Sequence, residues 1–306
     1  SLTNDTIIQV QNLSKMYRDV LAVNSLSFSV GYGDVFGFLG PNGAGKSTTI
    51  RMLLSLIFPT DGEVFLFGKS LKNNRNEVLR KVGAIVEKPD MYGYLSAYKN
   101  LEILGRISGC DVSRSRIMEM LELVGLAARA DSKVKTFSHG MKQRLGLAQS
   151  LLHNPELIIL DEPTTGLDPQ GMKEMRDIIN TLSTEKNITI FLSSHILHEV
   201  ELVANRMIIM NKGTAIVQGN VRELLSAANM KIRIETDNGD ATLRVINEGS
   251  FSVKPPEPAG DTVIIYNTRD VIPEITRSLV EQGVRVYSVV PTRSLEEYFL
   301  TITEKA

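Results

Sequence analysis

Short apolar blocks recur along the chain, and most of them end at polar residues. Mostly apolar runs occupy residues 34–39, 84–86, 157–160 and 188–192. Runs of this kind are typical of strands that are buried on both faces of a parallel sheet. The segments between them predict helices at 48–56, across most of 97–152, with Ser113 as an N-cap and Gly125 as a C-cap, and at 171–184. Strands separated by helices indicate an α/β fold.

A second pattern, the alternation of apolar and polar residues that is typical of strands, predicts β structure near the N-terminus. Residues 7–31 alternate in this way, with Leu26, Phe28 and Val30 on one face. Asp61-Gly62 is a hairpin-type dipeptide that leads into a strand at 63–67. A later hairpin pairs residues 207–210 with 215–217.

The pattern changes after Gly219 and predicts a separate small domain. Strands are expected at 231–236, 262–266 and 284–290, and helices from about Asn220 and at 270–282. Residues 238–245 fit either a helix or a strand, and 255–258 contain three prolines, which should interrupt regular structure. Ser294 and Glu297 predict the cap of a terminal helix. These elements suggest a split βαβ domain without a catalytic motif.

Composition excludes several classes of protein. The 306 residues include 34 Lys+Arg and 35 Asp+Glu, so there is no strong basic excess for binding nucleic acid. The single cysteine, Cys110, excludes an internal disulfide framework and suits a reducing compartment. No apolar run approaches the ~20 residues of a membrane span, and residues 1–5 lack signal-peptide features. We therefore expect a cytoplasmic protein whose membrane role, if it has one, comes through a partner.

The polar residues that end the parallel strands should converge on one edge of the sheet, where ligands bind in such folds. Residues 40–47, Gly-Pro-Asn-Gly-Ala-Gly-Lys-Ser, fit a phosphate-binding loop between a strand and a helix. Its backbone N–H groups, together with the helix dipole, would bind phosphates. Lys46 would contact the same phosphates, and the Ser47 hydroxyl would bind Mg²⁺. A plain glycine-rich turn is the alternative.

Two carboxylates follow the apolar run at 157–160. Asp161 would hold Mg²⁺ through water, and Glu162 would orient or deprotonate the attacking water. A pair of surface acids is the alternative, but four aliphatic residues stand directly before them.

The order of these motifs resembles the nucleotide-binding subunit of ABC transporters over residues 7–219. The resemblance rests on Tyr17, residues 40–48, 137–144 (Phe-Ser-His-Gly-Met-Lys-Gln-Arg), 161–163, 166–168 and His195. It implies that Tyr17 stacks on adenine and that Ser138 and Gly140 reach the γ-phosphate held by the opposite subunit. It also implies that Asp168 crosses the dimer interface and that His195 contacts the γ-phosphate. The implied nucleotide-binding set is Tyr17, Gly40, Pro41, Asn42, Gly43, Ala44, Gly45, Lys46, Ser47, Thr48, Ser138, Gly140 and Asp168.

Three residues depart from the usual family pattern. Glu87 stands where the family usually has Gln, so it is a candidate for the catalytic set and for Mg²⁺ contact. It resembles the bacitracin-resistance and lantibiotic-immunity branch. A surface acid with no special role is the alternative. His139 and Met141 replace small or amide residues of the signature.

Aromatic residues and methionine gather in the loop after Glu87. Met91, Tyr92, Tyr94 and Tyr98 follow turn-forming residues, which suggests either a contact surface or a local core. In the family this region receives a cytoplasmic helix of the membrane subunit, so the resemblance implies a permease that docks near 87–98.

The sequence therefore predicts an ABC ATPase core at 1–219, with a helical subdomain at about 88–155, and a small α+β domain at 220–306. The core would combine a mostly parallel sheet with an antiparallel β subdomain. The resemblance implies an exporter ATPase that uses ATP and Mg²⁺, dimerises head to tail with itself or a sister ATPase, and lies at the inner face of the membrane through its permease. The alternatives are a soluble ABC ATPase that acts on ribosomes or DNA, and a P-loop kinase. A metal site at His195 and Glu199 lacks a third ligand.

Overall fold

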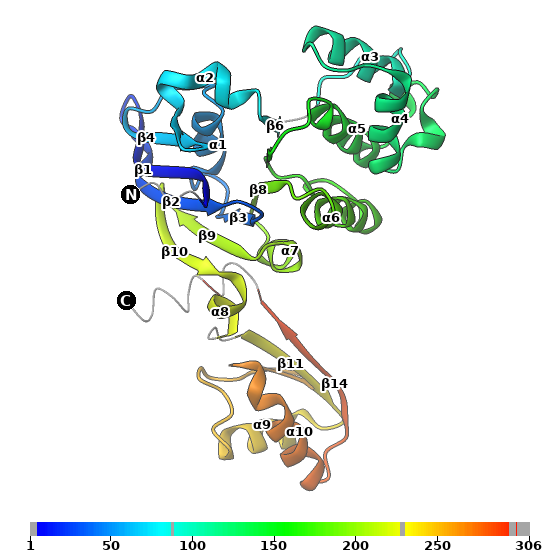
Figure 1. Cartoon of the computed structure of the whole chain (residues 1–306). Coiled ribbons are helices and arrows are strands. Elements are labelled where there is room, and N and C mark those ends of the chain that lie inside the picture. The colour runs from blue at the N-terminus through cyan, green and yellow to red at the C-terminus, as the bar shows by residue number, and fades with distance from the viewer. Residues whose placement is uncertain (1–4, 87–88, 227–229, 294–297, 299–306) are drawn as a thin grey trace. The chain divides into compact units, whose positions relative to one another are not determined.

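The computed structural model describes residues 5–86, 89–226, 230–293 and 298. The chain divides into two compact units, which are described separately. Unit 1 contains residues 1–195 and 199–219, and unit 2 contains residues 196–198 and 220–306. Figure 1 shows the elements of each unit.

A six-stranded, mostly parallel sheet forms the centre of unit 1. In this sheet β3 pairs in parallel with β8 and β9, and β7 pairs in parallel with β6 and β8. In spatial order the strands are β10 (Thr214–Asn220), β9 (Arg206–Asn211), β3 (Val35–Leu39), β8 (Thr189–Ser194), β7 (Leu157–Leu160) and β6 (Val82–Ile85). The expected parallel sheet is confirmed, and the strands that carry polar residues at their carboxyl ends are neighbours.

An antiparallel sheet packs beside it, in the order β2 (Val20–Gly31), β1 (Thr6–Tyr17), β4 (Asp61–Leu66) and β5 (Lys69–Ser70). The prediction that Asp61-Gly62 forms a hairpin turn is wrong, because both residues lie within β4. The turn falls at Phe67-Gly68, where both residues have positive φ (53° and 74°). Gly62 is instead needed because a Cβ there would lie 2.3 Å from the carbonyl oxygen of Asn12 in β1.

Four phenylalanines connect the two sheets of unit 1. Phe28 of β2 lies 5.6 Å from Phe36 and from Phe38 of β3, measured between ring centroids. Phe191 of β8 lies 5.2 Å from Phe38. Aromatic pairs at these distances add to the stability that burial alone gives. The cluster therefore holds β3, and with it the loop that begins at Gly40, in a rigid setting.

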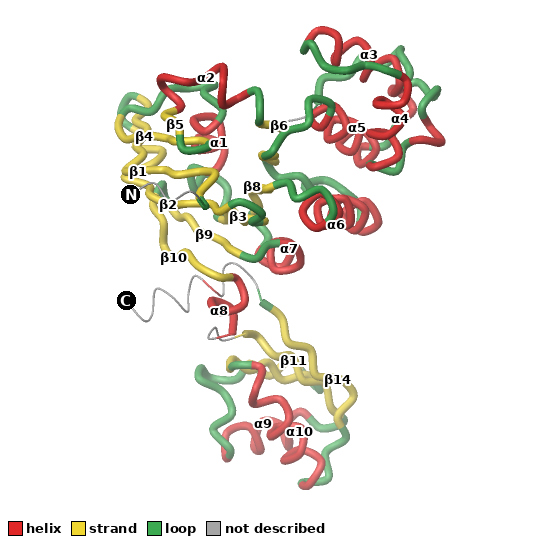
Figure 2. The backbone as a smooth tube through the Cα atoms, viewed as in Figure 1, coloured by secondary structure: helices red, strands yellow, loops and turns green. Residues whose placement is uncertain are grey.

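One set of helices covers this core, and a second set, α3 to α5, forms a separate helical subdomain (Figures 1 and 2). The core helices are α1 (Lys46–Leu53), α2 (Leu71–Leu79), α6 (Pro169–Thr184) and α7 (Leu197–Val203). The subdomain contains α3 (Ala97–Ile107), α4 (Arg114–Leu123), α5 (His139–Leu151) and the 3₁₀ turns η1 (Ala127–Arg129) and η2 (Val134–Thr136). Ser113 caps α4 as expected, since its side chain accepts a hydrogen bond from the backbone N–H of Arg116.

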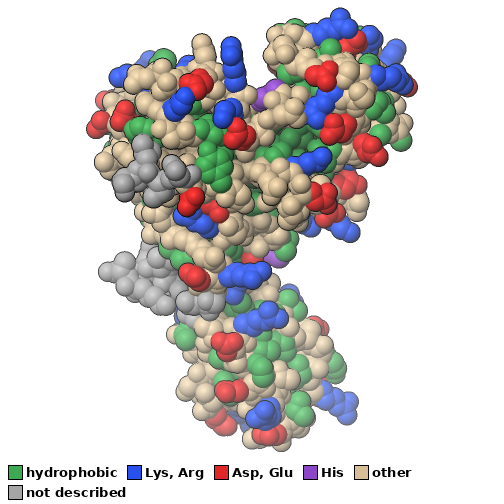
Figure 3. Space-filling view, viewed as in Figure 1, with side chains coloured by type: hydrophobic (Ala, Val, Ile, Leu, Met, Phe, Trp, Pro, Cys, Tyr) green, Lys and Arg blue, Asp and Glu red, His purple; other side chains and the backbone are tan. Residues whose placement is uncertain are grey.

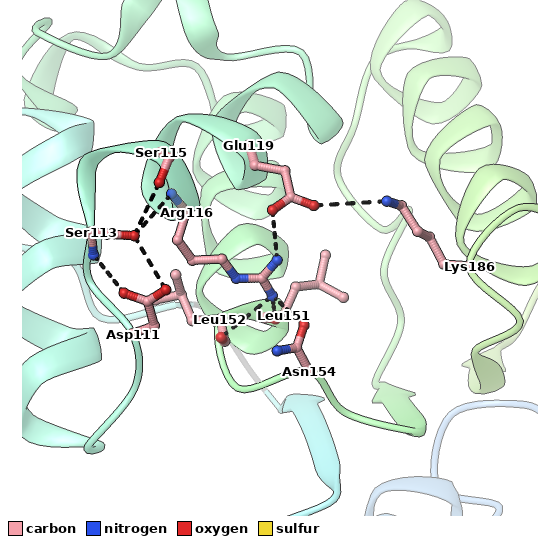
Figure 4. A network of polar contacts seen from close by, with 9 residues as sticks. All are labelled: Asp111, Ser113, Ser115, Arg116, Glu119, Leu151, Leu152, Asn154 and Lys186. Atoms are coloured by element: carbon pink, nitrogen blue, oxygen red, sulfur yellow. Dashed lines mark hydrogen bonds and ion pairs between the residues drawn. The ribbon is translucent and has the colours of Figure 1, made fainter.

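Arg116 ties α4 to the end of α5 (Figure 4). Its Nη2 atom donates to the Leu151 carbonyl oxygen at 2.9 Å and to Asn154 Oδ1 at 2.6 Å, and its Nη1 atom pairs with Glu119 at 2.9 Å. A cation at a helix C-terminus satisfies carbonyl groups that have no helical partner. Glu119 also lies 3.8 Å from Lys186, which follows α6, so this network continues from the subdomain to the core.

Unit 2 is a four-stranded antiparallel sheet with two helices on one side (Figure 2). The sheet order is β12 (Glu257–Ala259), β13 (Thr262–Asn267), β11 (Met230–Thr236) and β14 (Val286–Thr292). The two helices are α9 (Gly239–Glu248) and α10 (Ile272–Glu281), the latter preceded by η3 (Arg269–Val271), and a further helix, α8 (Val221–Ser226), comes before the sheet in the chain. Along the chain, β11, α9 and β12 form one βαβ half, and β13, α10 and β14 form the other, with β13 and β11 as the two central strands of the sheet.

Two details of unit 2 refine the sequence expectations. Residues 238–245, which fitted either a helix or a strand, belong to α9. The prediction that residues 255–258 interrupt all regular structure is wrong for Pro258, which lies in β12 and pairs with Val263. Proline is tolerated there because β12 is an edge strand, so its missing N–H removes no inner hydrogen bond. The expected terminal helix cap at Ser294 and Glu297 lies outside the described residues.

Across the residues described, no helix is both long enough and apolar enough to cross a membrane.

Candidate nucleotide site

The loop between β3 and α1 is shaped by close backbone contacts. A Cβ at Gly40 would lie 2.6 Å from the Met210 carbonyl oxygen, and one at Gly45 would lie 2.5 Å from the Ala22 carbonyl oxygen. Gly45 also has φ = 101°, a left-handed conformation that glycine adopts without strain. Gly43 has φ = 80°, and a Cβ there would meet no atom within 4 Å. The loop is therefore anchored to the core at both ends and open in the middle.

Lys46, the first residue of α1, turns back over this loop. Its side chain is only 6% exposed, and its Nζ atom donates to the carbonyl oxygens of Gly40 at 2.7 Å and Pro41 at 3.2 Å. The same atom lies 3.4 Å from Oε1 of Glu162. Lys46 thus joins the phosphate loop to the end of β7.

Asp161 and Glu162 follow directly after β7. Ser193 of β8, which is fully buried, donates from its hydroxyl to Asp161 Oδ1 at 2.6 Å and accepts from the Glu162 backbone N–H at 2.9 Å. Asp161 is therefore not a random surface acid, since a neighbouring strand holds its carboxylate.

The Glu162 carboxylate contacts side chains from the phosphate loop, from its own turn and from the residues that follow β8. Its Oε2 atom lies 2.8 Å from Nδ1 of His195 and accepts a hydrogen bond from the Thr165 hydroxyl at 2.9 Å, while Oε1 faces Lys46. Glu162 has φ = 51°. Non-glycine residues in this conformation are strained and cluster at functional sites. Sequence motifs that are far apart along the chain thus converge on one carboxylate.

A cavity of about 320 Å³ lies between these groups. It is lined by Ala22, Asn42, Gly43, Gly45, Lys46, Ser47, Thr48, Glu162, Thr165 and His195. An open glycine loop, a buried ammonium and two hydroxyls at a helix N-terminus form a donor set suited to a phosphate chain. The Ser47 hydroxyl and the Asp161 carboxylate are oxygen ligands of the kind that Mg²⁺ prefers. The residues present therefore fit a Mg²⁺–nucleoside triphosphate.

Tyr17 lies at the tip of the β1–β2 hairpin, whose residue Ala22 lines the cavity. Its side chain is 42% exposed, so one part of the ring is accessible to solvent. The Lys15 ammonium lies 5.2 Å from the ring centroid and makes a cation–π contact. Tyr17 is thus not a buried core residue.

Ser138 and Asp168 are the N-caps of α5 and α6. The Ser138 hydroxyl accepts from the Met141 N–H at 3.2 Å, and Asp168 Oδ1 accepts from the Gly171 N–H at 2.9 Å. Both caps are exposed. The two helix starts pack together, since a Cβ at Gly140 would lie 3.6 Å from Leu167.

A groove of about 590 Å³ runs between β6 and the helices α3 and α5. The wall on the β6 side is formed by Ala84, Ile85, Val86, Pro89 and Asp90, and the facing wall includes Leu104, Cys110, Gly146 and His153. Figure 3 shows a hollow between the part of unit 1 that carries α1 and α2 and the part that carries α3 to α5. Glu87, the predicted contact to Mg²⁺, lies outside the described residues.

The loop after this groove does not form one contiguous apolar core. Tyr94 is 82% exposed and Tyr92 is half exposed, while Met91 and Leu95 are partly buried. The Lys135 ammonium lies 5.6 Å from the Tyr94 ring centroid.

The sequence pattern assigns no role to two polar residues of the site. Ser193 stands out only as part of a strand end, and Thr165 belongs to none of the motifs. A single hydroxyl residue, whether in a turn or at a strand end, carries no distinctive sequence pattern, so only the geometry reveals these two contacts.

Comparisons with known proteins agree with this geometry. Residues 23–165 match the family model described as "ABC transporter". The bacitracin transport ATP-binding protein BcrA of Bacillus licheniformis is 42% identical over 299 residues, which cover 97% of each chain. The ABC transporter ATP-binding protein YhcH of Bacillus subtilis is 41% identical over 97% of this chain and 96% of its own length. The lantibiotic transport ATP-binding protein SrtF of Streptococcus pyogenes is 42% identical over 69% of this chain and 90% of its own length.

Solved structures give the same assignment. The structure of cbiO1 from Clostridium perfringens, part of the ABC transporter complex cbiONQ, superposes with a TM-score of 0.67 at 27% identity. The match covers 73% of this chain and 92% of cbiO1. The resemblance inferred from the motifs is confirmed, including the bacitracin and lantibiotic branch. The chain therefore belongs to the ABC transporter family, as one of its ATP-binding ATPase subunits.

Proposed function

We propose that this chain hydrolyses MgATP to drive export of a peptide antibiotic or drug through a separate membrane subunit. The observation that carries the proposal is the position of the Glu162 carboxylate, which lies between Lys46 of the phosphate loop and His195 in one cavity. The substrate class rests on relatives, whose names refer to bacitracin and lantibiotic transport.

Within this proposal, the phosphate loop binds the nucleotide. Lys46 exchanges its contacts with the loop carbonyl oxygens for the phosphates, and the backbone N–H groups of residues 42–48 surround them. Ser47 and Asp161 hold Mg²⁺, which neutralises charge on the phosphates when it is bound. Tyr17 stacks on the adenine with its exposed ring surface.

Glu162 acts as the general base that takes a proton from the attacking water. His195 contacts the same carboxylate and lines the cavity, which supports its proposed contact to the γ-phosphate. Glu87 is proposed as a further group near Mg²⁺ that links the site to the membrane subunit, and this role rests on the family resemblance alone.

A head-to-tail dimer, with a second copy or a sister ATPase, would complete each site. Ser138, Gly140 and Asp168 are the residues proposed to reach the nucleotide bound by the opposite subunit. The exposure of Ser138 and Asp168 at the adjoining starts of α5 and α6 supports this role, because the two segments form one continuous surface.

The membrane subunit is proposed to dock near residues 87–98 and to insert a helix into the groove between β6 and α5. The exposed rings of Tyr92 and Tyr94 support a contact surface there. Such docking would place the protein at the inner face of the membrane.

The experiment that tests the proposal is the variant Glu162→Gln, which keeps the shape of the side chain but cannot accept the proton. We expect ATP binding to persist and turnover to fall by about 10²-fold or more, because loss of a general base typically costs 10²–10⁴ in rate. Glu156→Gln, at the other end of β7 and exposed, is the matched control and should keep the parent rate. Parent turnover in Glu162→Gln would reject the proposed chemistry.

A further inference from the structure

We propose that Thr165 is a positioning residue for hydrolysis. Its hydroxyl donates a hydrogen bond to one carboxylate oxygen of Glu162, Oε2, so that the other oxygen, Oε1, accepts the proton from water. This inference rests on the proposed role of Glu162 and adds to it a residue and an atom.

The backbone of Glu162 is fixed before its side chain is considered. Its N–H donates to the buried Ser193 hydroxyl at 2.9 Å, and its carbonyl oxygen accepts from the Thr165 N–H at 3.2 Å. Ser193 is in turn anchored on Asp161 at 2.6 Å. These contacts hold the left-handed conformation at φ = 51°, so only rotation of the side chain remains free.

Three groups then compete for the carboxylate, and they divide between its two oxygens. Oε2 lies 2.9 Å from the Thr165 hydroxyl and 2.8 Å from Nδ1 of His195. An ionised carboxylate only accepts hydrogen bonds, so both groups must donate to it. Oε1 faces Lys46 at 3.4 Å and lies on the side of the phosphate loop.

The contact to Thr165 is the local one of these three. Thr165 belongs to the same turn as Glu162, only three residues away, so its hydrogen bond does not depend on any other segment. Lys46 is buried under the loop. When a nucleotide binds, the Lys46 ammonium would pair with the phosphates and would no longer contact Oε1. The Thr165 hydroxyl then keeps Oε2 occupied and the carboxylate in its observed orientation. Oε1 is left toward the cavity, where a water can reach it.

Thr165 also lines the cavity and is exposed, so its replacement should not disturb the core. Thr165→Val keeps the shape and removes the hydroxyl. We expect kcat to fall by about tenfold, which is ~1.4 kcal/mol in barrier height, with the ATP dissociation constant unchanged within about twofold. Thr165→Ser restores a hydroxyl and should recover most of the lost rate.

Two further variants separate this role from a general effect. Thr184→Val is the matched control and should keep the parent kcat. Thr184 is an exposed threonine at the end of α6, and its hydroxyl donates to the Asn180 carbonyl oxygen, so the variant makes the same chemical change away from the site. In the Glu162→Gln background, Thr165→Val should cause little additional loss, because the hydroxyl acts through the carboxylate.

Parent kcat in Thr165→Val would overturn the inference while leaving the role of Glu162 intact. A weaker ATP affinity at parent kcat would also overturn it, because Thr165 would then be a nucleotide contact. Persistent turnover in Glu162→Gln would instead reject the proposed function on which the inference rests.

Discussion

The Nζ atom of Lys46 lies 3.4 Å from Oε1 of Glu162, and the same ammonium donates to the carbonyl oxygen of Gly40 at 2.7 Å. The proposed phosphate-binding cation and the proposed general base are therefore paired with each other. Binding of a triphosphate must replace this pair, since Lys46 cannot neutralise the phosphates and keep all of its present partners. Nucleotide binding would therefore remove the Lys46 ammonium from its contact with the Glu162 carboxylate.

Lys46→Ala should weaken ATP binding by about 10- to 100-fold, because hydrogen bonds to charged groups contribute about 1.5–3 kcal/mol. Isothermal titration calorimetry with ATP measures this change. Lys72→Ala, at an exposed lysine of α2, is the control and should bind ATP as the parent does. Parent affinity in Lys46→Ala would contradict the proposed phosphate contact.

Much of this site could be predicted from sequence because its central parts are consecutive in the chain. Residues 40–47 carry their own turn chemistry, and Asp161 and Glu162 follow an unbroken apolar strand. The parts that could not be predicted depend on contacts between segments or on the shape of a turn. Ser193 reaches Asp161 from the neighbouring strand, and Thr165 reaches Glu162 within one turn.

The elements of the fold also divide into those that a local sequence pattern predicts and those that depend on tertiary contacts. The parallel strands were evident from continuous apolar runs, whereas α2 and α7 were not predicted because their apolar residues make weak helical patterns. Asp61-Gly62 resembled a hairpin turn by composition. Packing against Asn12 placed both residues inside β4 instead, so a tertiary contact decided against the local signal.

Ser138→Arg should abolish ATP-driven dimerisation while leaving nucleotide binding by the monomer within about twofold. The larger, charged side chain would stand at the exposed start of α5, where the opposite subunit is proposed to approach. Size-exclusion chromatography with light scattering, in the Glu162→Gln background and with MgATP, measures the dimer.

Ser113→Arg is the matched control, because Ser113 is also an exposed serine that caps a helix, at the start of α4. Both variants lose a cap, which costs ~1 kcal/mol of stability, but only Ser138→Arg should lose the dimer. With Glu162 intact, a mixture of Ser138→Arg with Lys46→Ala contains dimers with one intact composite site and should hydrolyse ATP in part. Parent activity of a monomeric Ser138→Arg protein would contradict the shared sites.

Glu199→Ala should destabilise the fold by about 1–2 kcal/mol. Arg176 of α6, whose side chain is 24% exposed, lies 3.1 and 3.2 Å from the two carboxylate oxygens of Glu199, whose side chain is 9% exposed. The variant removes hydrogen bonds between charged groups, which contribute about 1.5–3 kcal/mol, but water reaches part of the Arg176 guanidinium that is left. Chemical denaturation measures the free energy of unfolding.

The double variant Arg176→Met with Glu199→Met should recover part of that loss, because it removes both charges. A double variant less stable than Glu199→Ala would contradict this account.

Cys110 gives a reporter for the groove between β6 and α5, because it lines that groove and is the single cysteine of the chain. Burial raises the pKa of its thiol, and the charge of Arg116 opposes this effect only in part. The thiolate is the reactive form, so a raised pKa means less thiolate at any pH below it. Alkylation by iodoacetamide at pH 8 should therefore be slower than that of a cysteine in an unstructured peptide, and its rate should increase steeply toward pH 10.

The control places a cysteine at an exposed serine of α4, as Ser115→Cys in a Cys110→Ser background. This introduced thiol should react faster at pH 8, because it is not shielded by burial. If the membrane subunit docks in the groove, its presence should slow the alkylation of Cys110 by about tenfold or more and leave the introduced thiol of the control variant largely unaffected. Equal alkylation rates of Cys110 with and without the membrane subunit would place its docking surface elsewhere, since a helix seated in the groove would cover the thiol and exclude the reagent.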